Sequence, residues 1–212
     1  REAAYRLNVI GPKNLADACS LFGSKLIHFS TDYVFDGTGN RLWTEEDMPN
    51  PSNYYAETKL QGEEAVRRHR DSLVIRLQWL YGGKRDRFTI LKKRESFTPF
   101  SDQYGAPTWT REVCKTVKEL SALDAAGIVH FAYDDYASWA EVYEFVCREL
   151  QFSTKLIPKK TEEAKLPARR PLFGVMSNKK LIELLGRSGM GSWKPPLAEF
   201  LKMKGHFPTA TN

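Results

Sequence analysis

The sequence of 212 residues has little cysteine and no long hydrophobic run, and both shortages narrow its class. No apolar segment approaches the roughly 20 residues that cross a bilayer, which argues against an integral membrane protein. Three widely spaced cysteines form neither a metal-binding nor a disulfide pattern, so a reducing cytoplasm is the expected location. They are Cys19, Cys114 and Cys147.

Histidine is also scarce. The four histidines lie far apart, and none has a carboxylate at ligand spacing, so no metal site is predicted. They are His28, His69, His130 and His206.

Composition and charge point to a globular protein with small-molecule partners. Hydrophobic residues make up 42% of the chain and aromatic residues 12%, enough to build a core and to exclude a disordered class. The net charge of +6 comes from short basic groups with acids nearby, at 84–87, 92–94, 159–160 and 169–170. No RNA-binding aromatic signature or zinc-finger spacing accompanies them, so we expect no nucleic-acid partner and one or two phosphate contacts.

The first 83 residues alternate helix and strand. A helix is predicted over 2–22, interrupted at Gly11-Pro12 with a kink or a new start near Asn14, followed by a buried strand over 25–30. A second helix over 54–70 precedes a second buried strand over 72–77. This order is typical of an α/β doubly wound parallel sheet. Two strands are too few for such a sheet, so further strands are expected before residue 1.

The remainder of the chain is less regular. Ser138 and Glu141 have the spacing of a capping box at the start of a helix that ends at Leu150. A turn-rich stretch covers 101–108 and a loop-rich basic stretch covers 153–175. The other predicted elements are helices at 86–95, 110–123, 178–186 and 195–203 and a strand at 128–132.

The motif Tyr55-x-x-x-Lys59 opens the second helix. Four residues are about one helical turn, so the phenol and the ammonium group share a face. A phenol with a pKa near 10 is a poor acid-base group at neutral pH, and a nearby cation stabilises its phenolate. The same helix is expected to turn Leu60 and Ala65 inward and Glu63 outward. Two surface residues at a helix start are the alternative reading of the motif.

Hydroxyl groups follow the first strand, at Ser30 and Thr31. In an open α/β sheet, ligands bind at the carboxyl ends of the strands. A hydroxyl, a phenol and a lysine that meet there can polarise a carbonyl oxygen and supply its proton. The alternative is an ordinary turn at the end of the strand, with Asp32 capping nearby backbone.

Several blocks of sequence together resemble one family. Ser30-Thr31-Asp32-Tyr33-Val34-Phe35-Asp36-Gly37, with Tyr55-x-x-x-Lys59 after it, is similar to the extended short-chain dehydrogenase/reductase superfamily. Within it, the chain looks most like the dTDP-4-dehydrorhamnose reductase family. Further matching blocks are Arg76-x-x-Trp79-Leu80-Tyr81-Gly82, Asp102-Gln103-x-Gly105-x-Pro107-Thr108, Ser138-Trp139 and Ala168-Arg169-Arg170-Pro171.

The resemblance implies reduction of a 4-keto nucleotide-linked deoxysugar by NADPH or NADH. The resemblance implies that Tyr55 donates the proton and that Thr31 holds the carbonyl oxygen. Lys59 would bind the nicotinamide ribose and lower the pKa of Tyr55. Ser30, Tyr55 and Lys59 would contact the cofactor. The implied substrate-binding residues are Thr31, Asp32, Val34, Trp79, Gln103, Pro107, Thr108 and Arg170. Core packing is the alternative for Trp79, and a surface ion pair is the alternative for one of Arg169 and Arg170.

The family's glycine-rich dinucleotide fingerprint does not occur before Tyr55. The expected architecture is therefore the C-terminal part of a Rossmann-type doubly wound parallel sheet with a smaller substrate-side α/β region. Residues 1–83 would form the back half of the cofactor domain. Residues 84–212 would form mainly the substrate region, with some elements returning to the sheet.

Two other functions remain open, together with the state of assembly. The beta subunit of methionine adenosyltransferase resembles the same family, so a non-catalytic regulatory subunit bound to a methionine adenosyltransferase catalytic subunit is one alternative. A nucleotide-sugar epimerase or dehydratase is the other. A homodimer is a further expectation.

The missing fingerprint leads to a prediction about cofactor affinity. The chain of 212 residues has the catalytic motif without the usual cradle for the pyrophosphate, so we expect it to bind NADPH weakly by itself. A fluorescence titration of NADPH against this chain measures the affinity. A dissociation constant in the micromolar range would contradict the prediction.

Overall fold

A parallel three-stranded sheet forms the centre of the molecule, in a computed structural model that describes residues 1–83 and 87–204. Its strands are β1 (Leu26–Thr31), β2 (Ser72–Leu77) and β7 (Gly127–His130), in the order β1-β2-β7. Thr31 lies opposite Leu77, and Arg76 lies opposite His130, so the carboxyl ends of the strands meet at one edge. All six residues of β2 are buried, including Ser72 and Arg76, as is typical of the central strand of a parallel sheet.

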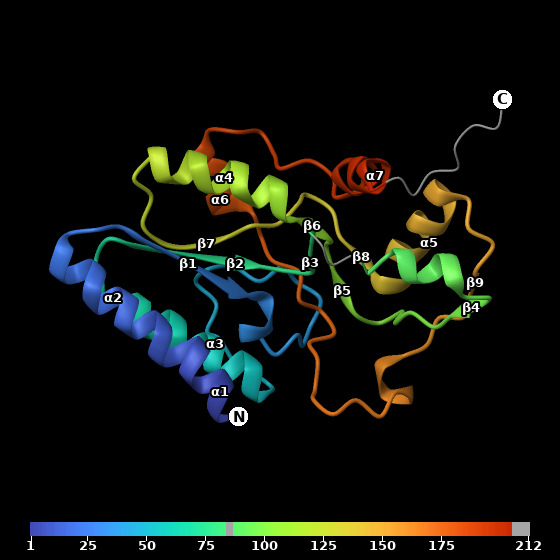
Figure 1. Ribbon diagram of the computed structural model, residues 1–212, viewed down its shortest axis with the longest axis horizontal. Coiled ribbons are helices and arrows are strands. Elements are labelled where there is room, and N and C mark those ends of the chain that lie inside the picture. Colours follow the sequence, from blue (N-terminus) through green and yellow to red (C-terminus); the bar gives the residue numbers. More distant parts are fainter. Residues whose placement is uncertain (84–86, 205–212) are drawn as a thin grey trace.

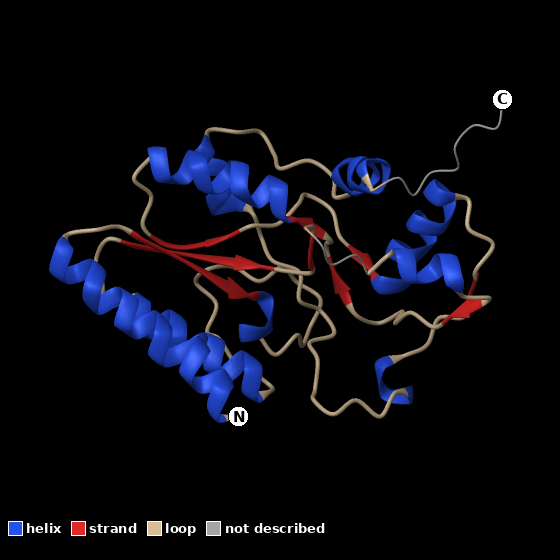
Figure 2. Ribbon diagram, viewed as in Figure 1, coloured by secondary structure: helices blue, strands red, loops and turns tan. Residues whose placement is uncertain are grey.

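Helices cover both faces of this sheet, which confirms the predicted α/β class (Figure 1). The helices α1 (Glu2–Tyr5), α2 (Gly11–Phe22) and α3 (Tyr54–Val66) pack on one side, and α4 (Thr110–Ala122) and α6 (Lys179–Leu185) lie on the other (Figure 2). None of the helices within 1–83 and 87–204 is long and apolar enough to span a membrane.

The N-terminal helical segment runs through Gly11-Pro12 without the predicted break. A π-helical turn, η1 (Arg6–Ile10), joins α1 to α2, and the Gly11 N–H donates to the Arg6 carbonyl five residues back. Pro12 has no N–H to donate to the carbonyl of Asn8, and the wider turn just before it accommodates that loss. The proline therefore changes the helix type where a kink was expected.

The backbone carbonyl of Asn8 lies directly against α3 at Gly62. A side chain at Gly62 would collide with this oxygen, so only glycine permits the approach. Beside it, Asn8 Nδ2 donates to Thr58 Oγ1 at 3.0 Å, and Thr58 Oγ1 donates to the Tyr55 carbonyl at 2.9 Å. These contacts fix the position of α3, the helix that carries Tyr55 and Lys59.

Helix α3 starts where predicted and ends earlier, at Val66 and not at residue 70. Asn53 caps its start by accepting a hydrogen bond from the Ala56 N–H. After its end, the His69 ring lies between Ser20 Oγ at 2.9 Å and the Ser24 carbonyl at 2.8 Å. These side-chain contacts hold the following turn in a non-helical conformation.

A buried ion pair joins α3 to the central strand. Arg76 Nη2 donates to Glu63 Oε2 at 2.7 Å, and both side chains are 2% exposed. The other end of the guanidinium lies 3.3 Å from His130 Nε2 and over the Phe35 ring. The prediction that Glu63 faces solvent was wrong, because an arginine on the neighbouring strand turns this helix position inward.

The second half of the chain adds α5 (Trp139–Leu150) and α7 (Lys194–Met203). The capping box of Ser138 and Glu141 is present as predicted. In place of the helix predicted over 86–95 there is a short 3₁₀ helix, η3 (Thr89–Lys93), while residues 84–86 lie outside the described part. Two further 3₁₀ turns are η2 (Asp32–Val34) and η4 (Thr161–Glu163).

Three small two-stranded pairs, none of them predicted, surround the edge of the main sheet. Each strand has only two residues, too few to show a hydrophobic period. They are β3 (Leu80–Tyr81) with β6 (Thr108–Trp109), β4 (Ser96–Phe97) with β9 (Lys155–Leu156), and β5 (Tyr104–Gly105) with β8 (Ala137–Ser138).

Two glycines in helices provide a matched test of the close approach at α3. A Gly62→Ala variant should lose about 1–3 kcal/mol of unfolding free energy, because its methyl group meets the Asn8 carbonyl. At Gly11 an added methyl group would lie 3.5 Å from its nearest neighbour, the Arg6 carbonyl, which is an ordinary contact. Gly11→Ala should therefore gain about 0.5–1 kcal/mol through helix propensity. Urea unfolding measures both, and equal effects of the two substitutions would contradict the packing argument.

Candidate active site

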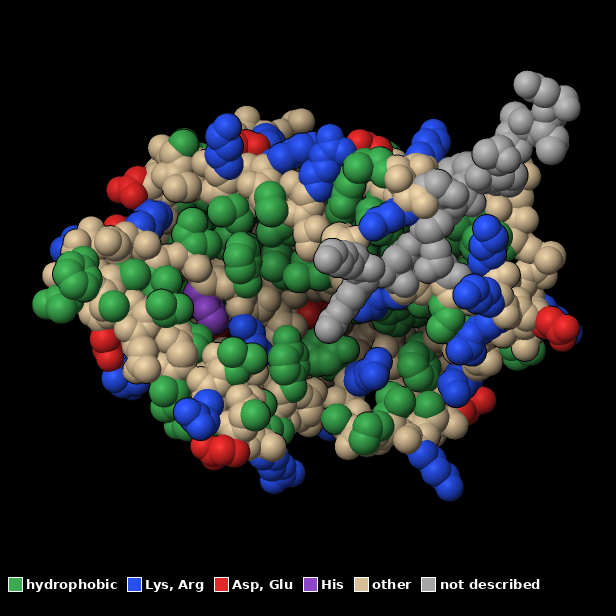
Figure 3. Space-filling model, in the orientation of Figure 1, with side chains coloured by type: hydrophobic (Ala, Val, Ile, Leu, Met, Phe, Trp, Pro, Cys, Tyr) green, Lys and Arg blue, Asp and Glu red, His purple; other side chains and the backbone are tan. Residues whose placement is uncertain are grey.

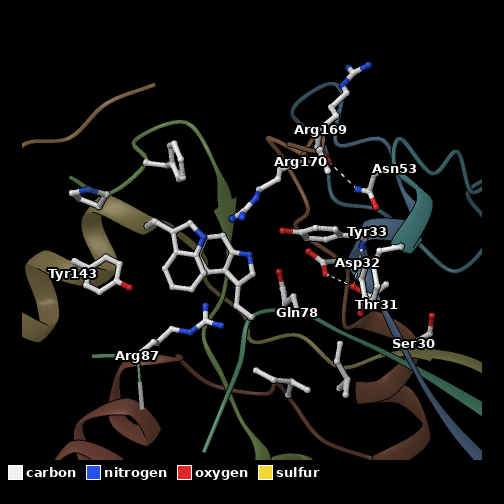
Figure 4. A pocket seen from close by; sticks show the side chains of 18 of the residues that line it. Ser30, Thr31, Asp32, Tyr33, Asn53, Gln78, Arg87, Tyr143, Arg169 and Arg170 are labelled. Carbon is white, nitrogen blue, oxygen red and sulfur yellow. Dashed lines mark hydrogen bonds between the residues drawn. The ribbon is translucent and has the colours of Figure 1, made fainter. Parts of the chain in front are cut away.

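A cavity of about 660 Å³ opens at the carboxyl ends of β1 and β2 (Figure 4). One wall comes from the end of β1 and the start of α3, and the other from the segment after β2, from α5 and from the loop around residue 98. A third segment, 168–170, closes one side. This is the sheet edge at which ligands bind in open α/β folds.

The hydroxyl of Thr31 lies at the end of β1, where the chain turns into η2. Thr31 Oγ1 donates to Asp32 Oδ1 at 3.0 Å and accepts from the Tyr33 N–H at 3.3 Å. Ser30, just before it, is 6% exposed, and its Oγ has no partner among the described residues. Ser30, Thr31 and Tyr33 line the cavity, and so does the predicted Asp32.

Tyr55 reaches the same end of the sheet from the first turn of α3. Its ring packs edge-on against Tyr33, two residues after Thr31, with centroids 6.2 Å apart. Tyr55 is 49% exposed and lines the cavity, so a substrate can approach it. The structure therefore places the phenol of Tyr55 and the alcohol of Thr31 in the wall of one cavity.

Lys59 lies one turn further along α3. Its Nζ donates to the Phe29 carbonyl of β1 at 2.6 Å, which anchors the ammonium beside the strand that carries Thr31. Burial lowers the pKa of Lys59, and the carboxylate of Glu63 opposes that shift. The lowered Tyr55 pKa expected from Lys59 is not seen, because burial, Asp32 and Thr31 are the influences on Tyr55 in this structure.

Burial dominates the electrostatics of the cavity. It raises the pKa of Asp32 to about 7, against hydrogen bonds from Thr31 and from backbone N–H groups. Burial also raises the pKa of Tyr55, the Asp32 carboxylate raises it further, and the Thr31 hydroxyl opposes them. Tyr55 is therefore protonated at neutral pH and can act as a proton donor.

Two stacked indoles form the opposite wall. Trp79 and Trp139 lie with their ring centroids 3.9 Å apart and an interplanar angle of 14°. The guanidinium of Arg87 covers the Trp139 ring at 5.0 Å. Trp79 has a φ of 43°, a left-handed conformation that is rare for a bulky residue. The predicted Trp79 thus lines the cavity, and Trp139 and Arg87 join it.

The two arginines of segment 168–170 both line the cavity, which includes the predicted Arg170. Asn53 Nδ2 donates to the Arg169 carbonyl at 2.9 Å and ties this segment to the start of α3. The positive charge of Arg170 reaches Tyr33, where it opposes the rise in pKa caused by burial. A second cavity of about 730 Å³ lies on the other side of the same segment, next to Asp36 and Asp102.

Four of the predicted substrate residues do not line the main cavity. Val34 is fully buried in a small core with Phe35. Gln103 donates from Nε2 to Thr161 Oγ1 at 2.9 Å. Pro107 is buried beside Thr108, whose backbone N–H donates to the Trp79 carbonyl at 3.2 Å. Thr108 therefore supports the indole wall from behind.

Within the described residues, no group of three or more histidine, cysteine, aspartate and glutamate side chains gathers. The His69 ring bonds to Ser20 and Ser24, and the His130 ring lies beside Arg76 in the core. His206 lies outside the described residues, as do Lys84, Arg85 and Asp86.

Comparison with known proteins identifies the family. The model of the RmlD substrate binding domain matches residues 1–205. The chain belongs to this family. Its parallel sheet is accordingly of the Rossmann type.

Individual RmlD relatives agree with the family match. The chain is 32% identical over 207 residues to the spore coat polysaccharide biosynthesis protein SpsK of Bacillus subtilis, over 95% of this chain and 72% of that protein. It is 33% identical over 187 residues to the dTDP-4-dehydrorhamnose reductase of Escherichia coli, over 80% of this chain and 62% of that protein. The chain thus spans about two thirds of the length of these relatives.

A solved structure shows the same fold. The dTDP-4-dehydrorhamnose reductase of Bacillus anthracis, in complex with NADP, matches with a TM-score of 0.90 and 30% identity. The match covers 96% of this chain and 74% of that one.

Gln78, Arg87, Tyr143 and Trp139 line the cavity, and the sequence patterns had given none of them a role. Trp139 lies in a block that the family resemblance had already marked, so that block could have pointed to it. Gln78 directly follows the buried strand β2, and a polar residue at the carboxyl end of a parallel strand is a usable signal. Arg87 and Tyr143 carried no comparable signal.

The raised pKa of Asp32 predicts a pH-dependent stability. Between its unfolded pKa of 3.8 and its folded pKa of about 7, the folded state holds the extra proton, so rising pH lowers the unfolding free energy. An Asp32→Asn variant removes this group, and its stability relative to the parent should rise by up to about 1.4 kcal/mol per pH unit across that window. Urea unfolding at pH 5, 6 and 7 measures the difference. Parallel curves for the two proteins would contradict the assignment.

Proposed function

We propose that this protein reduces the C4 carbonyl of a dTDP-linked 4-keto-6-deoxyhexose, with NADPH or NADH as the hydride source. The observation that carries the proposal is that Tyr55 and Thr31 line one open cavity at the carboxyl end of β1, with Lys59 bonded to that strand one turn further along α3. RmlD relatives named as dTDP-sugar reductases support the substrate class.

The residues at the carboxyl end of β1 fit the nicotinamide end of such a cofactor. Ser30 Oγ is buried without a partner among the described residues, and the Lys59 ammonium lies beside the same strand. Hydroxyl and ammonium groups are the donors that a ribose or a carboxamide needs. In this proposal Ser30, Tyr55 and Lys59 hold the nicotinamide ribose.

When bound, the reduced nicotinamide supplies hydride to the carbonyl carbon. The chain's own part is to hold the carbonyl oxygen and to give it a proton. Tyr55 donates the phenolic proton, which its raised pKa keeps in place at neutral pH. Thr31 donates a second hydrogen bond once its hydroxyl turns from Asp32 toward the substrate oxygen.

The other walls suit the nucleotide. Arg169 and Arg170 supply guanidinium groups, which bind diphosphate oxygens in pairs. The indole wall of Trp79 and Trp139 offers aromatic surface, and Arg87 adds positive charge beside it. We propose that the diphosphate lies against segment 168–170 and that the sugar lies between Trp79 and Tyr55.

The proposal also divides the chain into a cofactor part and a substrate part. Residues 1–83 would carry the cofactor side and residues 84–212 mainly the substrate side. Strand β7 belongs to the main sheet although it lies in the second part. Sugar-nucleotide reduction draws on cytoplasmic cofactor pools, so we propose a cytoplasmic location. A homodimer remains a prediction.

A turnover assay tests the proposal. NADPH oxidation is followed by its absorbance with dTDP-4-keto-6-deoxyhexose and the protein, including any sequence that its gene encodes before Arg1. Tyr55→Phe should lower kcat at least about 100-fold, because it removes only the proton donor. Tyr54→Phe is the matched control, since the Tyr54 hydroxyl bonds to the Arg1 carbonyl at 3.4 Å and lies outside the cavity.

The outcomes separate the competing functions. Turnover that depends on Tyr55 supports a reductase. Epimerised or dehydrated sugar without net NADPH oxidation would favour the epimerase or dehydratase reading. Absence of turnover together with co-purification of a methionine adenosyltransferase catalytic subunit would favour the regulatory reading.

A further inference from the structure

Gln78 lies at the base of the main cavity, just after the last residue of β2. Its side chain is 1% exposed and lines the cavity between the two walls. Figure 4 shows it extending into the cavity from the end of the strand. Neither the sequence motifs nor the proposed proton transfer uses this residue.

The orientation of the Gln78 amide is fixed by its neighbour. Oε1 accepts a hydrogen bond from the backbone N–H of Ala106 at 3.2 Å. A backbone N–H bonds to an oxygen and not to an amide NH₂ group, so the oxygen must face Ala106 and Nε2 must face the other way. The amide is therefore a donor directed away from Ala106.

That donor has no partner among the described residues. Gln78 Nε2 is buried and makes no hydrogen bond to them. A buried donor without a partner is destabilising, and a bound acceptor would remove that penalty. An unpaired donor in the wall of an open cavity is thus a place for a ligand oxygen.

An acceptor group lines the same cavity at Asp32. Its carboxyl is almost fully buried and accepts from Thr31 through Oδ1. The main chain packs closely on both polar groups at two glycines: a side chain at Gly105 would come 3.0 Å from Gln78 Oε1, and one at Gly174 would come 2.7 Å from Asp32 Oδ2. The main chain of these two glycine segments is joined, since the Gly174 N–H donates to the Tyr104 carbonyl.

A donor and an acceptor together match a hydroxyl group, which both accepts and donates. Thr31 Oγ1 and Asp32 Oδ1 are 3.0 Å apart, so the ligand oxygens that they bind must also be neighbours. If Thr31 holds the carbonyl oxygen, the hydroxyl on the adjacent carbon is the group within reach of Asp32. The hydroxyl beside the carbonyl is therefore the group that this corner of the cavity suits.

We propose that Gln78 is a specificity-determining residue that donates from Nε2 to the sugar hydroxyl on the carbon next to the reacting carbonyl. This rests on the proposed function for the identity of the sugar. Asp32 accepts the proton of the same hydroxyl. Gln78 thereby selects sugars that keep a hydroxyl at this carbon.

The test compares two substrates and three variants in steady-state kinetics. The substrates are dTDP-4-keto-6-deoxyhexose and its analogue without the hydroxyl next to the carbonyl. Gln78→Met removes the amide donor and keeps a similar side-chain size. Gln78→Glu removes the amide NH₂ group and keeps the oxygen that Ala106 needs. Gln61→Met is the control, because Gln61 lies on α3 outside the cavity. Parent and control should prefer the hydroxylated substrate in kcat/KM at least about tenfold, and both Gln78 variants should lose most of that preference.

A structural role would look different. If Gln78 only supported Ala106, Gln78→Met would lower kcat/KM for both substrates alike. Gln78→Glu, which keeps the oxygen that Ala106 needs, would then be nearly normal. An unchanged preference in the variants would overturn the proposal, while turnover by the parent would leave the proposed reductase function intact.

Equilibrium binding gives a readout that needs no turnover. Calorimetry with dTDP-6-deoxyhexose and with dTDP measures how much affinity the sugar adds. The sugar should add at least about tenfold less affinity in Gln78→Met than in the parent. The same gain in both proteins would overturn the proposal even if the parent reduced no sugar, a result that would separately refute the proposed function.

Discussion

The buried pair of Glu63 and Arg76 is the interaction on which the geometry of the site depends. It joins α3, which carries Tyr55 and Lys59, to the strand β2, which leads into Gln78. A buried ion pair adds little net stability, but the loss of one partner costs about 3–5 kcal/mol because a charge is left without compensation. The pair therefore favours one position of α3 along the sheet, because a shift of the helix would separate the two charges and leave each buried without a partner. The contact of Gly62 with Asn8 fixes the same helix from its other side.

Around this pair the molecule keeps its titratable groups close to neutral. Burial lowers the pKa of His130 to about 3, and burial together with the Lys59 charge lowers that of His28 to about 4. Burial raises the pKa of Asp32 to about 7. Lys59 lies at the same edge of the sheet, and Arg87, Arg169 and Arg170 line the cavity there. In the proposed function, the arginines would hold the charged nucleotide while the uncharged sugar carbonyl reaches Tyr55.

The sequence predicted the central sheet strands and the long helices because their apolar patterns are long enough to show a period. The sequence also indicated Thr31, Tyr55, Lys59 and Trp79, because each of them lies in a short motif that can be recognised from neighbouring residues alone. Glu63 was assigned to the wrong face, since its partner Arg76 lies on another strand and no local pattern reveals it. The two-residue strands and the stack of Trp79 on Trp139 depend on contacts between distant segments. Hydrophobic side chains also remain exposed on α2 and β1, among them Leu21, Phe22 and Phe29. Figure 3 shows that hydrophobic side chains reach the surface over much of the visible face.

The backbone of Trp79 has a consequence for the evolution of this site. Its φ of 43° suits glycine, and a large aromatic residue is held there at an energetic disadvantage. The Thr108 N–H and the Trp139 ring keep the strained conformer in place. A mutation to glycine at this position would relax the main chain and erase the aromatic surface in one step. In the proposed function, selection for ligand recognition and selection for fold stability therefore oppose each other at this residue. A descendant that no longer binds the ligand would be expected to replace Trp79 early.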